Sequence, residues 1–231
     1  ATPRPSIQGI QTAVVVGPPG EEIHCDSHGR VRVQFHWDRQ SQHSEDSSCW
    51  VRVSHPWAGA GYGAMFIPRV GQEVLVQFLE GDPDRPVIIG RVYNGDNPVP
   101  HDLPNHKAVT TLRTASTPGG QGYNEIRFTD TAGHEEIFIH AQKNRREIIG
   151  HNDNCTIRAN RTTTVAAQDT LQVGNTLTIQ AGSEIILKVG GSTVTITPSG
   201  ITMTGSAMSH NAKSMALTAP SMQMTGTVKI N

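Results

Sequence analysis

The stretch HEEIF at residues 134–138 is the first place where residue types and spacing could do chemistry. It begins like the helix of a zinc protease, in which a second histidine one turn later completes the metal site and the glutamate acts as general base. Phe138 stands where that second histidine would be needed. The segment also alternates apolar and polar residues like a strand, which would separate the ligands onto opposite faces. We therefore expect no metalloprotease, and the chain contains no Gly-x-Ser-x-Gly turn of a serine hydrolase.

Histidines elsewhere suggest a different kind of site. His210 interrupts an apolar series, between Met203 and Leu217. If three chains met along an axis there, one histidine would become three converging imidazoles, which suffice as protein ligands for zinc. The alternative is that His210 is hydrogen-bonded among the three chains and binds no metal. We expect no cofactor, apart from the metal ion that could lie on such an axis. His101 and His106, in a Pro-rich stretch, are expected to be solvated.

The composition argues against several classes of protein. Of 231 residues only 35% are hydrophobic and 5% aromatic, which is low for a chain that must build its own globular core. The net charge of −1 gives no bulk attraction to nucleic acid. Cys25, Cys49 and Cys155 lack the spacing of a metal finger, and an odd number does not suit a secreted disulfide framework, so we expect reduced thiols.

Apolar and polar residues alternate from residue 171 onward, which predicts strands with one apolar face. A second period of about seven residues lies on top of the alternation, with turn residues such as Pro198 and Pro220 between the repeats. A coiled coil would need helix-forming residues and charged flanks in place of the Thr, Gly and Ser found here. Strands this short cannot bury their apolar side alone, because repeat units need neighbours to cover it.

Three chains wound about one axis would supply those neighbours. We therefore predict an all-β protein with an elongated, intertwined trimeric β-helix or β-prism, although two chains or a stacked fibre also satisfy the periodicity. The residues predicted to face the trimer core are Leu171, Val173, Leu177, Ile179, Ile185, Leu187, Val194, Ile196, Ile201, Met203, Met208, Met215, Leu217, Met222 and Met224.

The N-terminal part has the pattern of a separate domain. Short alternating segments separated by turns rich in Gly and Pro, such as residues 81–86, are typical of a small barrel of the OB type. We assign residues 1–94 to this barrel, residues 95–123 to a linker rich in Pro and polar residues, and residues 124–231 to the β-helix, called the needle below. The predicted core of the barrel contains Phe35, Val51, Val76 and Phe78.

Five stretches of the chain resemble the VgrG family, the spike proteins of the bacterial type VI secretion system. They occur in the family's order and span most of the chain. The stretches are residues 28–39 (HGRVRVQFHWDR), 50–54 (WVRVS), 67–74 (IPRVGQEV), 81–86 (GDPDRP) and 135–143 (EEIFIHAQK).

The resemblance implies an OB-fold followed by a trimeric needle, similar to the puncturing device of contractile phage tails, with a hub region ahead of Ala1. It implies a structural part and not an enzyme: a spike assembled in the bacterial cytoplasm, secreted to the outside or into a target cell, that pierces its envelope. Implied partners are two further copies, a PAAR-repeat tip protein, secreted effectors and the inner tube protein, with transient membrane contact and no nucleic acid. Tip docking is assigned to Val228, Lys229, Ile230 and Asn231.

A binding module is the alternative function. In that case the barrel would capture a ligand and the needle would serve as a trimerisation stalk. OB-folds bind oligonucleotides and sugars, usually through exposed aromatic residues on a basic face. Trp37, Trp50 and Trp57 could form such a surface, although the balanced charge argues against nucleic acid.

Overall fold

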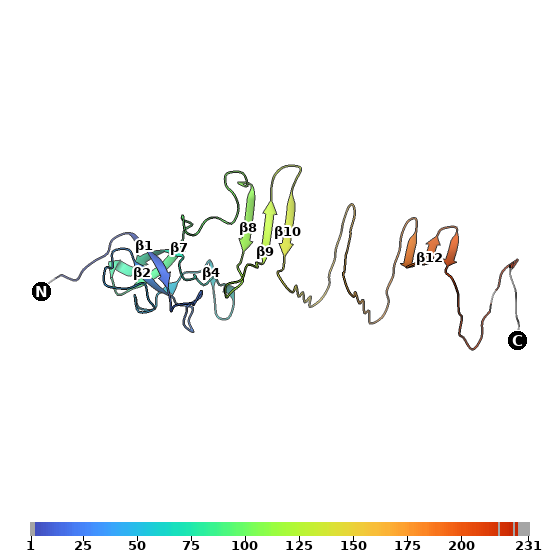
Figure 1. The fold of residues 1–231 in the computed structure, drawn as a ribbon, viewed down its shortest axis with the longest axis horizontal. Coiled ribbons are helices and arrows are strands. Elements are labelled where there is room, and N and C mark those ends of the chain that lie inside the picture. Colours follow the sequence, from blue (N-terminus) through green and yellow to red (C-terminus); the bar gives the residue numbers. More distant parts are fainter. Residues whose placement is uncertain (1–2, 217, 224, 226–231) are drawn as a thin grey trace. The chain divides into compact units, whose positions relative to one another are not determined.

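The computed structural model describes residues 3–216, 218–223 and 225. The chain divides into two compact units, residues 1–153 and 154–231. Strands dominate (Figure 1), and the described residues contain one 3-10 turn, η1 (Leu79–Gly81), but no α-helix. The predicted all-β class is confirmed. Within the described part of the chain, no helix has the length and hydropathy needed to cross a membrane.

The first unit begins with five strands that form one sheet. They are β1 (Ile10–Val16), β2 (Arg32–Phe35), β3 (Arg52–Val53), β6 (Glu73–Phe78) and β7 (Pro86–Arg91). Their order in the sheet is β2-β1-β6-β7-β3, with antiparallel pairing except between β3 and β7, which run parallel.

A backbone bridge closes this sheet into a barrel. Val31 precedes β2 and Val51 precedes β3, so the two residues adjoin the two edge strands of the sheet. The Val31 N–H donates to the Val51 carbonyl at 3.1 Å, and the Val51 N–H donates to the Val31 carbonyl at 2.8 Å. Closure satisfies backbone groups that would otherwise be unpaired at an open edge.

The inward side chains of the barrel form the hydrophobic core of the first unit. Successive residues of a strand point to opposite faces, so every second residue of β6 is buried. The rings of Phe35 and Phe78 lie 5.7 Å apart within this core. The four residues predicted for the barrel core are confirmed among its members, which are Ala13, Val15, Val31, Val33, Phe35, Val51, Val74, Val76, Phe78 and Ile88.

A short hairpin projects from the barrel between β3 and β6. Its strands are β4 (Trp57–Ala58) and β5 (Gly63–Ala64), which pair antiparallel. Gly63 has φ +142°, and a Cβ at this position would lie 2.4 Å from the Trp57 carbonyl oxygen. Only glycine therefore lets the two strands of this hairpin approach each other.

A second sheet of the first unit follows the barrel (Figure 1). Its strands β8 (Val109–Arg113), β9 (Glu125–Thr129) and β10 (Glu136–His140) are antiparallel, in the order β10-β9-β8. β8 lies inside residues 95–123, for which the sequence predicted a linker. Two consecutive threonines, Thr110 and Thr111, stand between Val109 and Leu112, so apolar and polar residues do not alternate strictly along this strand. The strand forms because it pairs with β9 along its whole length.

The second unit holds a three-stranded antiparallel sheet and extended segments on either side of it. The strands are β11 (Ile185–Val189), β12 (Ser192–Thr197) and β13 (Gly200–Thr204), in that order. Residues 171–179 alternate like a strand but are not strand-paired within the single chain. No described residue of this unit is buried, so one chain provides it with no core of its own.

Candidate functional site

The sheet of the second unit separates apolar from polar side chains onto two faces. Residues directly opposite each other on neighbouring strands share a face. On the polar face Thr195 lies between Ile186 and Thr202, and Ile186 is the one large apolar residue there. The apolar face contains two three-residue cross-strand rows, Ile185 with Ile196 and Ile201, and Leu187 with Val194 and Met203, and the pair Val189 and Ser192 follows them.

This apolar face is open to solvent in the single chain. The exposed fraction is 59% for Leu187, 64% for Ile201 and 53% for Met203. A contiguous exposed apolar surface of this kind marks an interaction site. The sequence-predicted core residues beyond the sheet are exposed as well, whereas Leu217 and Met224 lie outside the described residues; the exposed ones are Leu171, Val173, Leu177, Ile179, Met208, Met215 and Met222.

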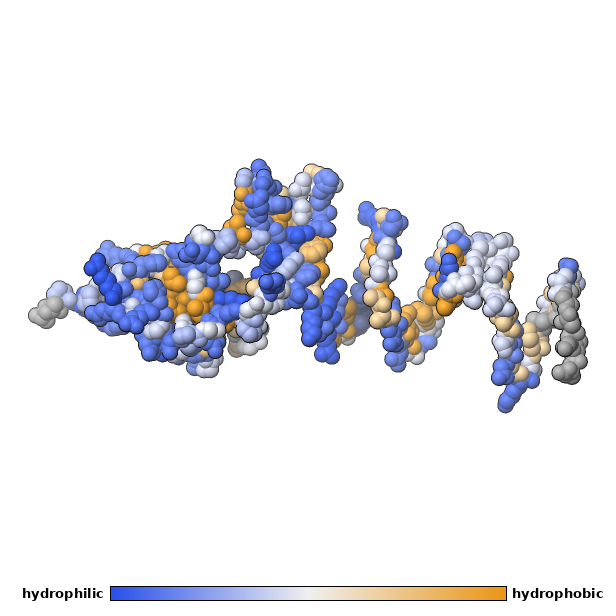
Figure 2. All heavy atoms as spheres, in the orientation of Figure 1, coloured by the Kyte–Doolittle hydropathy of each residue, from blue (hydrophilic) through white to orange (hydrophobic). Residues whose placement is uncertain are grey.

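The sheet β8–β10 carries a second apolar face that the predicted trimer core did not include. Figure 2 shows apolar residues at the surface along these strands as well as on the second unit. Apolar residues alternate along β9 and β10, so the sequence carries a signal for this face. The register places on one face Leu112, Ile126 and Ile139 in one row, and Thr110, Phe128 and Ile137 in the next.

The opposite face of β8–β10 is polar and internally paired. The Arg127 guanidinium lies 4.5 Å from the Phe138 ring centroid and 3.1 Å from the Glu136 carboxylate. The Arg113 guanidinium lies 3.8 Å from the ring centroid of Tyr123. Since this face already satisfies its polar groups while the other leaves its apolar groups exposed, the apolar face is the one that requires a partner.

Glu125, on this polar face, is buried with a side-chain exposure of 1%. Its Oε1 accepts a hydrogen bond from the Thr111 hydroxyl at 2.8 Å and lies 3.1 Å from His101 Nε2. Burial would raise the pKa of Glu125, but these two hydrogen bonds and the positive charges of His101 and Arg127 lower it below its usual value. The prediction that His101 is solvated was wrong, because its partner lies 24 residues away in the sequence and no local pattern reveals it.

The predicted metal site and the predicted tip-docking residues cannot be located in the described part of one chain. His210 is exposed. Among the described residues of one chain, no cluster of three His, Cys, Asp or Glu side chains could hold a metal ion. The site predicted at His210 involves three chains, and it stays a prediction. The residues assigned to tip docking, Val228, Lys229, Ile230 and Asn231, lie outside the described residues.

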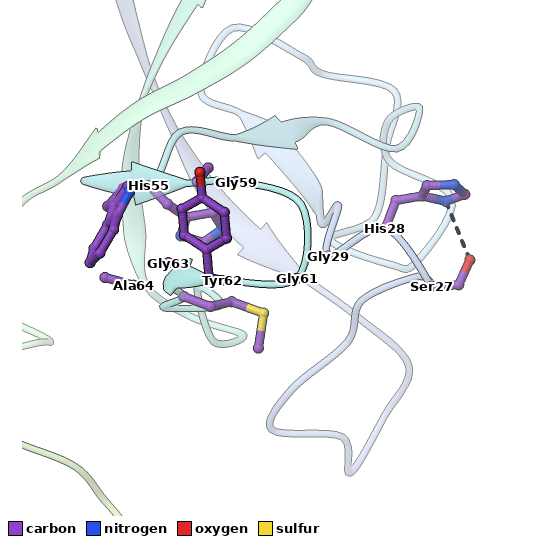
Figure 3. A pocket seen from close by; sticks show the side chains of 12 residues that line it. Ser27, His28, Gly29, His55, Gly59, Gly61, Tyr62, Gly63 and Ala64 are labelled. Carbon is purple, nitrogen blue, oxygen red and sulfur yellow. Dashed lines mark hydrogen bonds between the residues drawn. The ribbon is translucent and has the colours of Figure 1, made fainter.

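The barrel has an aromatic-lined pocket of about 490 Å³ beside the β4–β5 hairpin. Figure 3 shows Tyr62 in the β4–β5 hairpin and His28 on a separate loop, and both line the pocket together with His55. The rings of Trp57 and Tyr62 meet edge to face at 5.6 Å, and both side chains are 63% exposed. His55 is held in place because its Nδ1 accepts the Phe66 N–H at 3.2 Å.

The three tryptophans considered for a ligand surface lie against three different partners. Trp37 stacks on Phe35 with centroids 4.8 Å apart. Trp50 has the Arg32 guanidinium 4.7 Å from its ring centroid. Trp57 alone lines the pocket beside the hairpin. The chemistry that this pocket offers is therefore one tryptophan, one tyrosine and imidazole groups.

Two family models match the chain, the first over the barrel and the second over the sheets that follow it. The type VI secretion system/phage-baseplate injector OB domain matches residues 21–93, which hold most of the barrel. The bacteriophage T4 gp5 C-terminal trimerisation domain matches residues 110–218, which hold both apolar sheet faces. The barrel and the apolar faces described above thus coincide with an injector domain and a domain that trimerises in the phage protein.

Curated relatives agree with these matches. The chain is 58% identical over 149 residues to the type VI secretion system spike protein VgrG4b of Pseudomonas aeruginosa, covering 64% of this chain and 18% of the relative. It is 56% identical over 155 residues to the spike protein VgrG3 of Vibrio cholerae, covering 67% of this chain and 15% of the relative. The chain thus spans less than a quarter of the length of these relatives, and over that span it is similar to the VgrG family of type VI secretion spike proteins.

Proposed function

We propose that three copies of this chain associate through their apolar sheet faces and form the barrel and needle of a type VI secretion spike. The observation that carries the proposal is the cross-strand register. It gathers Ile185, Leu187, Val194, Ile196, Ile201 and Met203 on a single exposed face, with Thr-rich positions on the other. Three such faces turned toward one axis would bury the apolar side chains and keep the threonines hydrated.

The function proposed for this trimer is mechanical. Pushed by the contractile machine, it would pierce the envelope of a target cell, after assembly in the bacterial cytoplasm. A PAAR-repeat protein at the C-terminal tip, secreted effectors and the inner tube protein are its proposed partners. Winding three chains together suits the task, because each short strand is then held by neighbours on other chains and not by a local core.

Mass determination tests the association directly. Light scattering on the purified 231-residue chain should give a particle of about three times 24.9 kDa. The trimer should persist at low micromolar concentration, since the core of the second unit exists only between chains. A stable monomer under these conditions would refute the proposal, and a dimer would refute the threefold arrangement.

A metal ion at His210 is proposed as an addition to the trimer. Three copies of this exposed side chain would meet if the apolar series around it faces the axis, and three imidazoles can ligate zinc. Metal content of the trimer, compared with that of His210→Ala, tests the site. Equal metal content in the two proteins would leave His210 as a hydrogen-bonding residue.

The aromatic pocket supports ligand capture as a second candidate function. Trp57 and Tyr62 are exposed at its rim, and aromatic faces with imidazole groups can bind sugar rings. Titration of the trimer with glycan fragments, monitored by tryptophan fluorescence, tests this function. The Trp57→Ala variant is the control that identifies the pocket. A glycan that binds the original chain and not this variant would favour the binding module.

A further inference from the structure

A cleft of about 640 Å³ lies between the barrel and β8, within the first unit. The barrel contributes Arg69 from the loop before β6, Arg91 from the end of β7 and Tyr93 after it, and β8 contributes Arg113. No aspartate or glutamate is among the residues that line the cleft. It is therefore a concave surface with three cationic side chains and no anionic one.

The three arginines are held in place by neutral groups. Arg69 Nη2 donates to the Ala115 carbonyl at 2.8 Å, and Arg91 donates to the Phe66 carbonyl. Arg113 lies over the Tyr123 ring. A guanidinium has five N–H donors, so each of these contacts fixes the side chain and leaves most of its donors available.

The charges of these three arginines are not neutralised by a paired carboxylate among the described residues. In the described part of the chain no carboxylate oxygen lies within 4.0 Å of their nitrogens, whereas Arg30 and Arg127 are both paired with acidic side chains. Glu22 is the acidic residue that acts on Arg69 through space. Its carboxylate already accepts hydrogen bonds from Thr117 and the Gly119 N–H, which lower its pKa.

The cleft is on the side of β8 that trimerisation leaves free. Thr111 and Arg113, which line it, alternate with Leu112, so they lie on the polar face of the sheet. Leu112 belongs to the apolar face proposed to meet the other copies. Association through that face therefore keeps the arginines accessible, and in this respect the inference rests on the proposed function.

We propose that this arginine cleft binds an acidic, extended peptide segment of a second protein carried by the spike. Carboxylates match the planar fork of a guanidinium and can pair with it in a bidentate manner. β8 is an edge strand, so an extended segment can also pair with its backbone. Phe66 and Tyr93 add exposed aromatic surface for the apolar parts of such a segment. The net charge of −1 and the small volume of the cleft favour a peptide over a nucleic acid.

Fluorescence anisotropy of labelled hexaglutamate with the full 231-residue chain tests this site. Hexaglutamine with the same label measures the contribution of backbone and label alone. We expect hexaglutamate to bind and hexaglutamine not to bind. Arg91→Gln and Arg113→Gln should each weaken hexaglutamate binding by about tenfold or more, because each removes a charge-assisted pair. The matched control is Arg145→Gln, which removes an exposed arginine outside the cleft and should change binding less than about twofold.

Other outcomes would overturn the proposal. Equal weakening by Arg91→Gln and Arg145→Gln would mean that binding follows overall charge. Binding of a single-stranded oligonucleotide as tightly as hexaglutamate, or full displacement of the peptide by millimolar phosphate, would mean a general anion surface. The mass of every variant is measured in parallel. A monomeric chain that still shows the arginine-dependent binding would refute the trimer but support the peptide site in the cleft. A trimer without such binding would support the trimer but refute the peptide site.

Discussion

An aspartate placed at each of two adjacent positions of β12 distinguishes the trimer from the isolated chain. Ile196 belongs to the apolar face, and Thr195 belongs to the opposite face. In one chain alone Ile196 is the more exposed of the two, so a monomer would accept Ile196→Asp at least as readily as Thr195→Asp. The trimer reverses that order, because it covers Ile196 and leaves Thr195 in water.

The expected size of the effect follows from the exposure of Ile196. Its side chain is 38% exposed in the single chain. Full burial of an isoleucine contributes about 1.5–3 kcal/mol, so covering the remaining surface contributes roughly 0.6–1.1 kcal/mol per chain. An unpaired buried carboxylate costs several kcal/mol more, so over three chains Ile196→Asp should cost on the order of 10 kcal/mol. Thr195→Asp should cost about 1 kcal/mol per chain, through the lower strand propensity of aspartate.

Two measurements made on both variants check this expectation. Light scattering reports the mass, and limited proteolysis reports the protection of residues 154–231. Ile196→Asp should lose protection of the second unit while the barrel stays resistant, and Thr195→Asp should behave like the original chain. Equal protection in the two variants would refute the assignment of inner and outer faces, and the trimeric β-helix with it.

Three further predictions concern other parts of the chain. Phe35→Ala should destabilise the barrel by about 3–5 kcal/mol in urea unfolding, and the mass should still be that of a trimer, because the association surfaces lie elsewhere. Because the pKa of Glu125 is lowered by folding, its carboxylate stabilises the fold above the unfolded pKa of about 4.3, and this stability is lost as the pH falls through the folded pKa. Glu125→Gln should therefore reduce the loss of thermal stability at acid pH. An unchanged loss in this variant would contradict the role of the buried carboxylate. Met215→Asp should expose the distal needle to protease and abolish secretion-dependent killing of target cells, whereas Thr218→Asp should be tolerated; loss of killing in both would contradict the alternation there.

The barrel could be predicted from the sequence because apolar and polar residues alternate along its longer strands. Along β6, every second residue is apolar and buried, so the alternation that defines the strand also defines the core. The same applies to the β11–β13 sheet, where strands and turns follow one another within a few residues. For these elements the face of each side chain follows from the period of two alone.

Strand β8, the environment of His101 and the arginine cleft could not be predicted, because each depends on contacts between residues that are distant in the sequence. β8 has two consecutive threonines and is a strand only because β9 pairs with it. The environment of His101 is set by Glu125, and the arginine cleft combines residues from the loop before β6, from β7 and from β8. Such sites arise from the tertiary fold, so no periodicity along the chain announces them.

The contrast in burial between the two units has a consequence for the order of folding. The barrel has a complete core within one chain, so its folding should be unimolecular and independent of protein concentration. No described residue of the second unit is buried, so the ordering of this unit must await the encounter of chains and should accelerate with concentration. Until that encounter, its exposed apolar strands can aggregate with other unfolded chains as well as associate into the trimer. Synthesis of neighbouring chains on one messenger RNA would shorten this vulnerable interval.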